Sequence, residues 1–151
     1  MSDDLIKLYS GRILALAADM PATDPIDAPM ATGKVRAPLC GSVVSVSLDV
    51  DDAGRIARYA QDVKACALGQ AAASVTGRAL PGCDAAQVAA ARDELAAMLT
   101  ADGPPPRAPF DGLAVLQPAR DYRNRHASIL LSLDATLDAL RSLDAVRLTP
   151  G

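Results

Sequence analysis

Apolar residues recur along the chain at two spacings, one typical of helices and one typical of strands. The first helical pattern lies near the amino terminus, and its buried face consists of Leu5, Leu8, Tyr9, Ile13 and Leu16. Ser2 or Asp3 can cap this helix by accepting a hydrogen bond from its first free amides. Pro21 ends it, because proline disfavours helical backbone at the residue that precedes it.

A strand pattern follows a loop at 21–33. The valines and leucine at positions 44, 46, 48 and 50 alternate with polar residues, so that successive side chains point to opposite faces. Residues 51–54 (Asp-Asp-Ala-Gly) form a turn, and 55–63 is the return strand. With 34–38 as a shorter strand, the pattern predicts a three-stranded antiparallel sheet with one apolar face.

Three further helices supply the cover for that face. Residues 65–76 are almost all small and form a helix that Gly77 ends, and Asp84 caps the next helix. Leucines at 130, 133, 137 and 140 mark a last helix of four to five turns, while the prolines at 104–106 and 109 make 101–112 an exposed loop. We therefore expect a single α+β domain over 1–151, with helices packed on one face of the sheet.

Composition narrows the classes of function. Half of the residues are hydrophobic, enough for one core, and only 3% are aromatic. Lys plus Arg number 15 against 18 for Asp plus Glu, and no local basic run is visible, which argues against nucleic-acid binding. No apolar run approaches the roughly 18 residues that span a bilayer. Because the chain opens Ser-Asp-Asp rather than with a basic leader, we expect a cytoplasmic protein without a membrane partner.

Two of the three cysteines fall where the predicted sheet can bring them together. Cys40 lies between the first two strands and Cys66 directly follows the third. If the strands form a meander, both positions lie at the same end of the sheet. The free amides at a helix start stabilise a thiolate there, and two converging thiolates are half of a tetrahedral site for a soft metal. Cys83 stands apart, at a helix entry, and we interpret it as a bystander.

Several segments together resemble one family. They are Ala-Pro-Leu-Cys-Gly-Ser at 37–42, Lys-Ala-Cys-Ala-Leu at 64–68, Ala-Ala-Ala-Ser at 71–74 and Tyr-Arg-Asn-Arg-His-Ala-Ser at 122–128. In order and spacing they resemble the iron–sulfur cluster assembly scaffolds of the IscU/SufU type, also found as the amino-terminal domain of NifU. The resemblance covers nearly the whole chain, and the long stretch between Cys66 and Ser128 is closer to the SufU branch.

The resemblance implies a ligand set that this chain carries in part. Cys40 and Cys66 occupy the first two of the family's three cysteine positions, whereas Ser42 stands at the aspartate position and Ser128 at the third cysteine position. A serine hydroxyl stays protonated and is a poor ligand for a soft ion. A stable site then needs help from Ser42, Ser128 or His126, or from a homodimer that pairs two half-sites.

The function that the resemblance implies is that of a scaffold and not of an enzyme. Cys40 and Cys66 would hold iron, a transient iron–sulfur cluster or zinc, or would accept sulfur from a cysteine desulfurase for transfer to apo iron–sulfur acceptor proteins. The alternative is a metal-free pseudo-scaffold that acts through protein contacts in cluster assembly. A third hypothesis is a thiol-dependent enzyme, which requires Cys40 or Cys66 activated beside His126.

Overall fold

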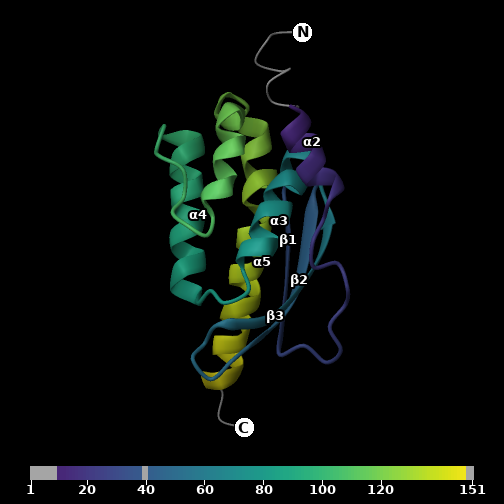
Figure 1. Cartoon of the computed structure of the whole chain (residues 1–151). Helices are drawn as coiled ribbons and strands as arrows, with labels where there is room; N and C mark the ends of the chain where they lie inside the picture. The colour runs from purple at the N-terminus through teal and green to yellow at the C-terminus, as the bar shows by residue number, and fades with distance from the viewer. Residues whose placement is uncertain (1–9, 39–40, 149–151) are drawn as a thin grey trace.

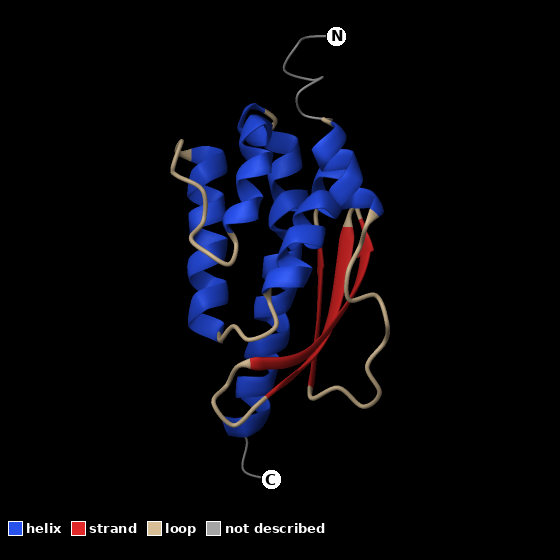
Figure 2. Cartoon of the chain, viewed as in Figure 1, coloured by secondary structure: helices blue, strands red, loops and turns tan. Residues whose placement is uncertain are grey.

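The computed structural model describes residues 10–38 and 41–148. Its sheet consists of β1 (Ala31–Arg36), β2 (Val43–Val50) and β3 (Ile56–Lys64), in the spatial order β1-β2-β3 with both pairs antiparallel. The helices lie together on one face of this sheet (Figure 2). The predicted α+β architecture, a three-stranded meander with helices on one face, is confirmed.

The longest helix is central to the arrangement (Figure 1). It packs against two strands, β1 and β2, and against three of the other helical elements, so that the sheet and the outer helices share one support. The helical elements are α2 (Gly11–Ala18), α3 (Ala67–Ala79), α4 (Ala85–Thr100), the 3-10 helix η1 (Asp111–Asp121) and α5 (Arg123–Leu148), the central one.

Strand β2 carries the predicted alternation along its whole length. Val44, Val46, Leu48 and Val50 are buried against the helices, while the residues between them are partly exposed on the other face. This alternation fixes the register, because a slip by one residue would turn every apolar side chain away from the helices.

The helix boundaries agree with the sequence where a cap sets them. Asp84 caps α4 with a reciprocal pair of hydrogen bonds, in which Asp84 Oδ1 accepts from the Gln87 amide at 2.9 Å and Gln87 Oε1 accepts from the Asp84 amide at 3.0 Å. α2 ends at Ala18, before Pro21, as predicted. The predicted caps Ser2 and Asp3 lie outside the described residues, and Ser10 caps α2 by accepting from the Ile13 amide.

Two predicted helix ends were wrong. Gly77 does not end α3, which continues to Ala79. A Cβ at Gly77 would lie 2.7 Å from Gln61 Nε2, so glycine is needed there for close packing rather than as a stop. The last helix, α5, has 26 residues, longer than the four to five turns marked by its leucines, because its first turns bury serine and histidine instead.

The first strand and the stretch before α5 also differ in detail from the prediction. β1 begins at Ala31 rather than at position 34. Most of 101–109 is exposed, whereas Pro106 and Phe110 are buried and Asp111 begins η1, an element that the alternation and periodicity did not indicate.

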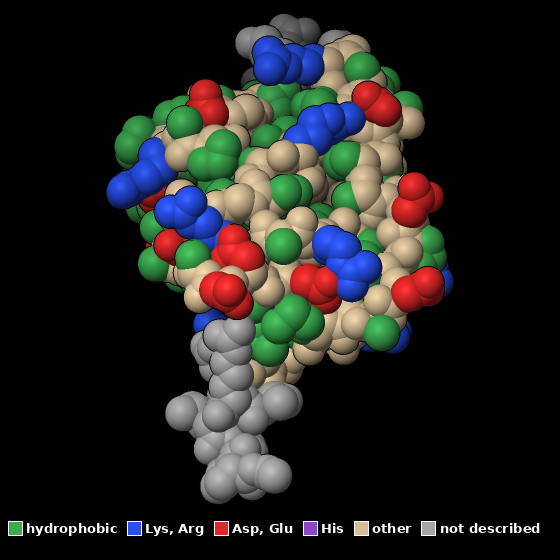
Figure 3. Space-filling view, turned by 60° about the horizontal axis from the view of Figure 1, so that its bottom comes forward, with side chains coloured by type: hydrophobic (Ala, Val, Ile, Leu, Met, Phe, Trp, Pro, Cys, Tyr) green, Lys and Arg blue, Asp and Glu red, His purple; other side chains and the backbone are tan. Residues whose placement is uncertain are grey.

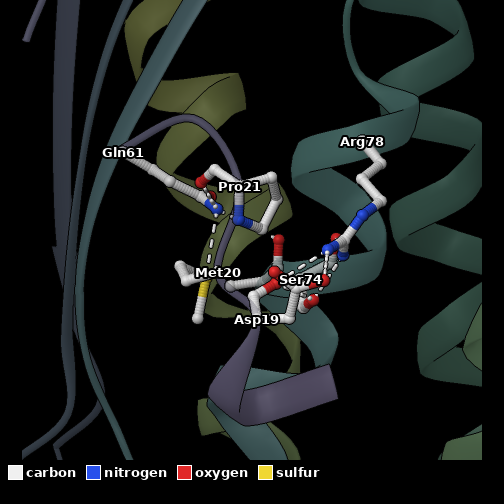
Figure 4. Close-up of polar contacts among 7 residues, drawn as sticks. Asp19, Met20, Pro21, Gln61, Ser74 and Arg78 are labelled. Carbon is white, nitrogen blue, oxygen red and sulfur yellow. Dashed lines mark hydrogen bonds and ion pairs between the residues drawn. The ribbon is translucent and has the colours of Figure 1, made fainter. Parts of the chain in front are cut away.

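Side chains of α3 and β3 form hydrogen bonds with the segment that follows α2 (Figure 4). The Arg78 guanidinium donates to the Asp19 carbonyl at 2.7 Å and to its carboxylate at 2.9 Å, which joins α3 to the end of α2. Gln61 Nε2, on β3, donates to the Pro21 carbonyl at 3.2 Å and to the Ala73 carbonyl at 3.1 Å. The amino-terminal helix is therefore held against α3 by side chains from two elements.

The closest approach of helix and sheet generates a test of this packing. A Cβ at Gly33 on β1 would lie 2.3 Å from the Ala135 carbonyl oxygen and 2.6 Å from the Ala139 nitrogen, both α5 backbone atoms that cannot rotate away. We expect Gly33→Ala to lower the free energy of unfolding by about 1–3 kcal/mol, as overpacked cores do. Urea denaturation measures this, and Gly11→Ala is the control because its Cβ would meet nothing within 4 Å. Equal stability of the two variants would contradict the prediction.

Candidate functional site

Three segments that are far apart in the sequence converge at one end of the sheet. Ser42 lies directly before β2, Cys66 is the residue that precedes α3, and Ser128 lies in the second turn of α5. The loop that carries Ser42 is closed by the Ala37 amide, which donates to the Ser42 carbonyl at 2.8 Å, and by the Gly41 amide, which donates to the Ala37 carbonyl at 3.0 Å. The meander therefore brings the loop after β1 and the end of β3 together, as the strand order requires.

Hydrogen bonds join the three side chains. Cys66 Sγ and Ser128 Oγ are 3.5 Å apart and share a hydrogen bond, and Ser128 Oγ donates to Ser42 Oγ at 3.2 Å. Both serines are buried, whereas Cys66 is half-buried. We refer to Ser42, Cys66 and Ser128 as the thiol cluster. The candidate ligand Cys40 lies outside the described residues.

A glycine on α3 makes room for the thiol cluster. A Cβ at Gly69 would lie 2.4 Å from Ser128 Oγ and 3.1 Å from the Ser128 carbonyl oxygen. The absence of a side chain at this position lets α5 approach the first turn of α3, and so places Ser128 beside Cys66.

The chemistry of the described donors is limited. The thiol cluster offers one sulfur and two hydroxyl oxygens, and hydroxyls that remain protonated bind soft metals poorly. Within 10–38 and 41–148, no three His, Cys, Asp or Glu side chains are grouped so that they could hold a metal ion. A soft-metal site at this end therefore requires donors in addition to these three.

His126 is not brought to the thiol cluster. Its ring is buried, and Nε2 donates to the carbonyl oxygens of Ala119 at 3.1 Å and Arg120 at 3.0 Å, at the end of η1. The ring lines a polar cavity of about 710 Å³ together with Arg120 and Arg123. Activation of Cys66 as a nucleophile by His126 would need a hydrogen bond between the two side chains, whereas His126 Nε2 is bonded to main-chain carbonyls.

Cys83 is buried at the far end of α3. Its Sγ donates to the Ala79 carbonyl at 3.3 Å, and burial together with the neighbouring Asp84 raises the pKa of the Cys83 thiol. A buried thiol of raised pKa is a weak nucleophile and a weak ligand, which agrees with its interpretation as a bystander.

A second polar group lies deeper between α3, α5 and the sheet. Thr76 and Ser132 share a hydrogen bond of 2.7 Å between their hydroxyls, and Tyr59 donates to Gln61 Oε1 at 3.0 Å. The sequence interpretation missed these residues. Their signal was the recurrence of a hydroxyl every four residues on the buried face of α5, at Ser128, Ser132 and Thr136.

The lengths and composition of the helices, and the charges on one face, describe the exterior of the molecule. None of the helices in the described part of the chain is long and apolar enough to span a bilayer. On the face shown in Figure 3, acidic and basic side chains are interspersed. Ion pairs in the described part of the chain include Arg92–Asp134 at 2.9 Å and Arg107–Glu94 at 2.9 Å.

Comparison with known structures includes a relative with clear sequence similarity. A crystal structure described as a nitrogen-fixing NifU-like protein (N-terminal) from Brucella abortus is 40% identical, with a TM-score of 0.90 over 95% of this chain and 99% of that one. No family model matches the chain, and no curated protein does.

Two more distant structures share the fold. A protein from Fervidobacterium islandicum AW-1, described as an iron–sulfur cluster assembly scaffold for the SUF system, is 16% identical with a TM-score of 0.79 over 89% of this chain and 98% of that one. A protein described as hypothetical is 19% identical, with a TM-score of 0.78 over 90% and 98%. At these identities the likeness concerns the fold alone.

The buried tyrosine on β3 predicts that the stability of the protein depends on pH. Burial raises the pKa of Tyr59 from 10.0 to about 12, so above pH 10 the unfolded chain ionises this group while the folded chain does not. The stability that the neutral phenol contributes is complete below pH 10 and is lost as the pH rises through 12; by pH 11 the loss is about 1.4 kcal/mol.

Urea denaturation at pH 9 and pH 11 measures this loss. The fall in the free energy of unfolding should be smaller in Tyr59→Phe than in the native chain by that amount, since other groups titrate equally in both. An identical pH dependence of the two proteins would refute the assignment.

Proposed function

The chain belongs to the NifU-like family of iron–sulfur cluster assembly scaffolds, and on that premise we propose that Cys40 and Cys66 carry iron, a transient iron–sulfur cluster or sulfur. A scaffold holds its cargo and passes it on, and is not an enzyme. The partners we propose are a cysteine desulfurase that supplies sulfur and apo iron–sulfur proteins that receive the cargo. We place this exchange in the cytoplasm.

The observation that carries the proposal is the position of Cys66. Its thiol is half-buried at the amino end of α3, beside Ser42 and Ser128, where three segments of the chain meet. A sulfur at this position is the softest donor among the three side chains of the thiol cluster, and soft donors suit iron and zinc. Cys40 is two positions from Ser42 in the sequence, and this proximity supports its inclusion as the second thiol.

This chain differs from the ligand pattern of the family in the donors other than the two cysteines. Two thiolates leave two positions of a tetrahedral site, for which a zinc ion or a cluster needs further ligands. Ser42 and Ser128 are the nearest groups, and a partner protein or a second copy of the chain are the other sources. We propose a labile site, with cargo that is held weakly and released readily.

Metal content tests the proposal. We expect protein that is purified anaerobically without a metal-binding tag, then reconstituted with iron and sulfide, to hold metal or cluster near stoichiometry. Cys40→Ser/Cys66→Ser should lose it, because hydroxyls replace both thiolates. Cys83→Ser is the matched control, since this thiol lies outside the thiol cluster and its loss should leave the metal count unchanged. Metal that survives the double substitution would refute the proposal.

Rebuilding the ligand pattern of the family should strengthen the site. Ser42→Asp/Ser128→Cys adds a carboxylate and a thiol next to Cys66, and we expect release of the metal to a chelator to slow by about tenfold or more, the scale on which single metal-site groups act. Ser142→Cys, an exposed position on α5, adds a thiol elsewhere and should change nothing. Thermal denaturation verifies that each variant is folded, and unchanged release from a folded double variant would count against a metal site here.

A metal-free pseudo-scaffold is the second candidate function. The hydrogen bond between Ser42 and Ser128 favours it, because each hydroxyl already has a hydrogen-bond partner and is satisfied without a metal ion. Trace metal in the native chain after reconstitution, together with full occupancy in Ser42→Asp/Ser128→Cys, would assign the protein to this class.

A further inference from the structure

The end of the sheet beside the thiol cluster carries two cations in one row. Arg36 on β1 and Lys64 on β3 both pair with Val43 on β2. Residues in register point to the same face, and strands lie about 4.8 Å apart, so the Cα atoms of the two residues are about 10 Å apart and their side chains point to the face that no helix covers. Both side chains are exposed, and Cys66 follows Lys64 by two residues.

The start of α5 adds two more cations at this end. Arg123 is exposed, and Arg125 is half-buried one turn before Ser128, on the same side of the helix. In Figure 1 the start of α5 lies at the same end of the molecule as the ends of β1 and β3. We refer to Arg36, Lys64, Arg123 and Arg125 as the basic rim.

The basic rim is not neutralised within the described part of the chain. None of its four side chains forms an ion pair there, in contrast to five arginines elsewhere that contact carboxylates: Arg58, Arg78, Arg92, Arg107 and Arg120. Three acidic side chains are nearby: Asp62 on β3, and Asp102 and Asp121, which line one cavity with Arg123. They reduce the positive charge without forming an ion pair with the basic rim in the described part of the chain.

The opposite end of the molecule carries charges of both signs. Asp51 and Asp52 lie in the turn between β2 and β3, which leads to the exposed Arg55, and Asp84 lies at the start of α4. The chain has a formal net charge of −3, so the four cations of the basic rim differ in sign from the charge of the molecule as a whole. A local group of cations orients a protein as it approaches an acidic partner.

We propose that the basic rim docks an acidic surface of a partner protein over the thiol cluster. The inference rests on the proposed function, because a protein that delivers or takes cargo must reach Cys66. An acidic protein surface of limited extent suits this arrangement better than nucleic acid, since a long phosphate backbone would also meet the acidic remainder of the molecule.

A labelled oligoglutamate peptide serves as the probe of this surface. Its binding to the metal-free chain is measured by fluorescence anisotropy, so the result is independent of the metal count. We expect Arg36→Gln/Lys64→Gln to weaken binding about tenfold, the combined effect of a few exposed ion pairs, and added salt to weaken it as well. Arg55→Gln/Arg141→Gln removes the same charge from exposed residues away from the rim and should change the affinity by less than about twofold.

Protection of the thiol locates the docked peptide. In Cys40→Ser/Cys83→Ser, bound oligoglutamate should slow the alkylation of Cys66, and a neutral oligoglutamine peptide should not. The proposal is overturned if the two charge variants bind alike, if alkylation is not slowed, or if a thymidine oligonucleotide binds as tightly as oligoglutamate. Circular dichroism confirms that the variants are folded, so that each of these outcomes concerns docking and not stability.

Discussion

The close approach of α5 to its neighbours is the constraint on which the rest of the structure depends. β1 comes so near that glycine is required at position 33, and α3 comes so near that glycine is required at position 69. Between α3 and α5 a pair of buried hydroxyls, Thr76 and Ser132, is joined by a hydrogen bond. Packing of this density leaves no room for relaxation, so a methyl group added at the interface must move backbone.

The thiol cluster is a consequence of this packing. Because α5 lies against the first turn of α3, Ser128 contacts Cys66, and because the meander returns to the same end, Ser42 completes the contact. The cluster is poor in charge and has a single described sulfur. A site of this composition holds a soft metal only with the help of Cys40 and further donors, which is why the proposed function depends on partners and why the approach to this end matters.

The basic rim and the thiol cluster together indicate how such partners are selected. The basic rim belongs to strand ends and to a helix start, the same elements that fix the cluster, so docking on the rim and access to Cys66 are linked by geometry. His126, by contrast, is bound to the end of η1 and stabilises that junction. We therefore propose separate roles for the two groups: the basic rim orients a partner, and the thiol of Cys66 binds the cargo.

The sequence by itself determined the elements whose signal is local. Alternation along β2, the Asp84 cap and the prolines set strands, starts and stops, and the segments around Cys40, Cys66 and Ser128 resemble the family. Only the tertiary structure decided that Gly77 lies inside α3, where α5 starts and that η1 forms. It also decided that the His126 ring is bonded to the end of η1. Periodicity tells which face of an element is buried. It does not tell what that face meets, because close contacts and buried hydrogen bonds depend on residues far apart in the chain.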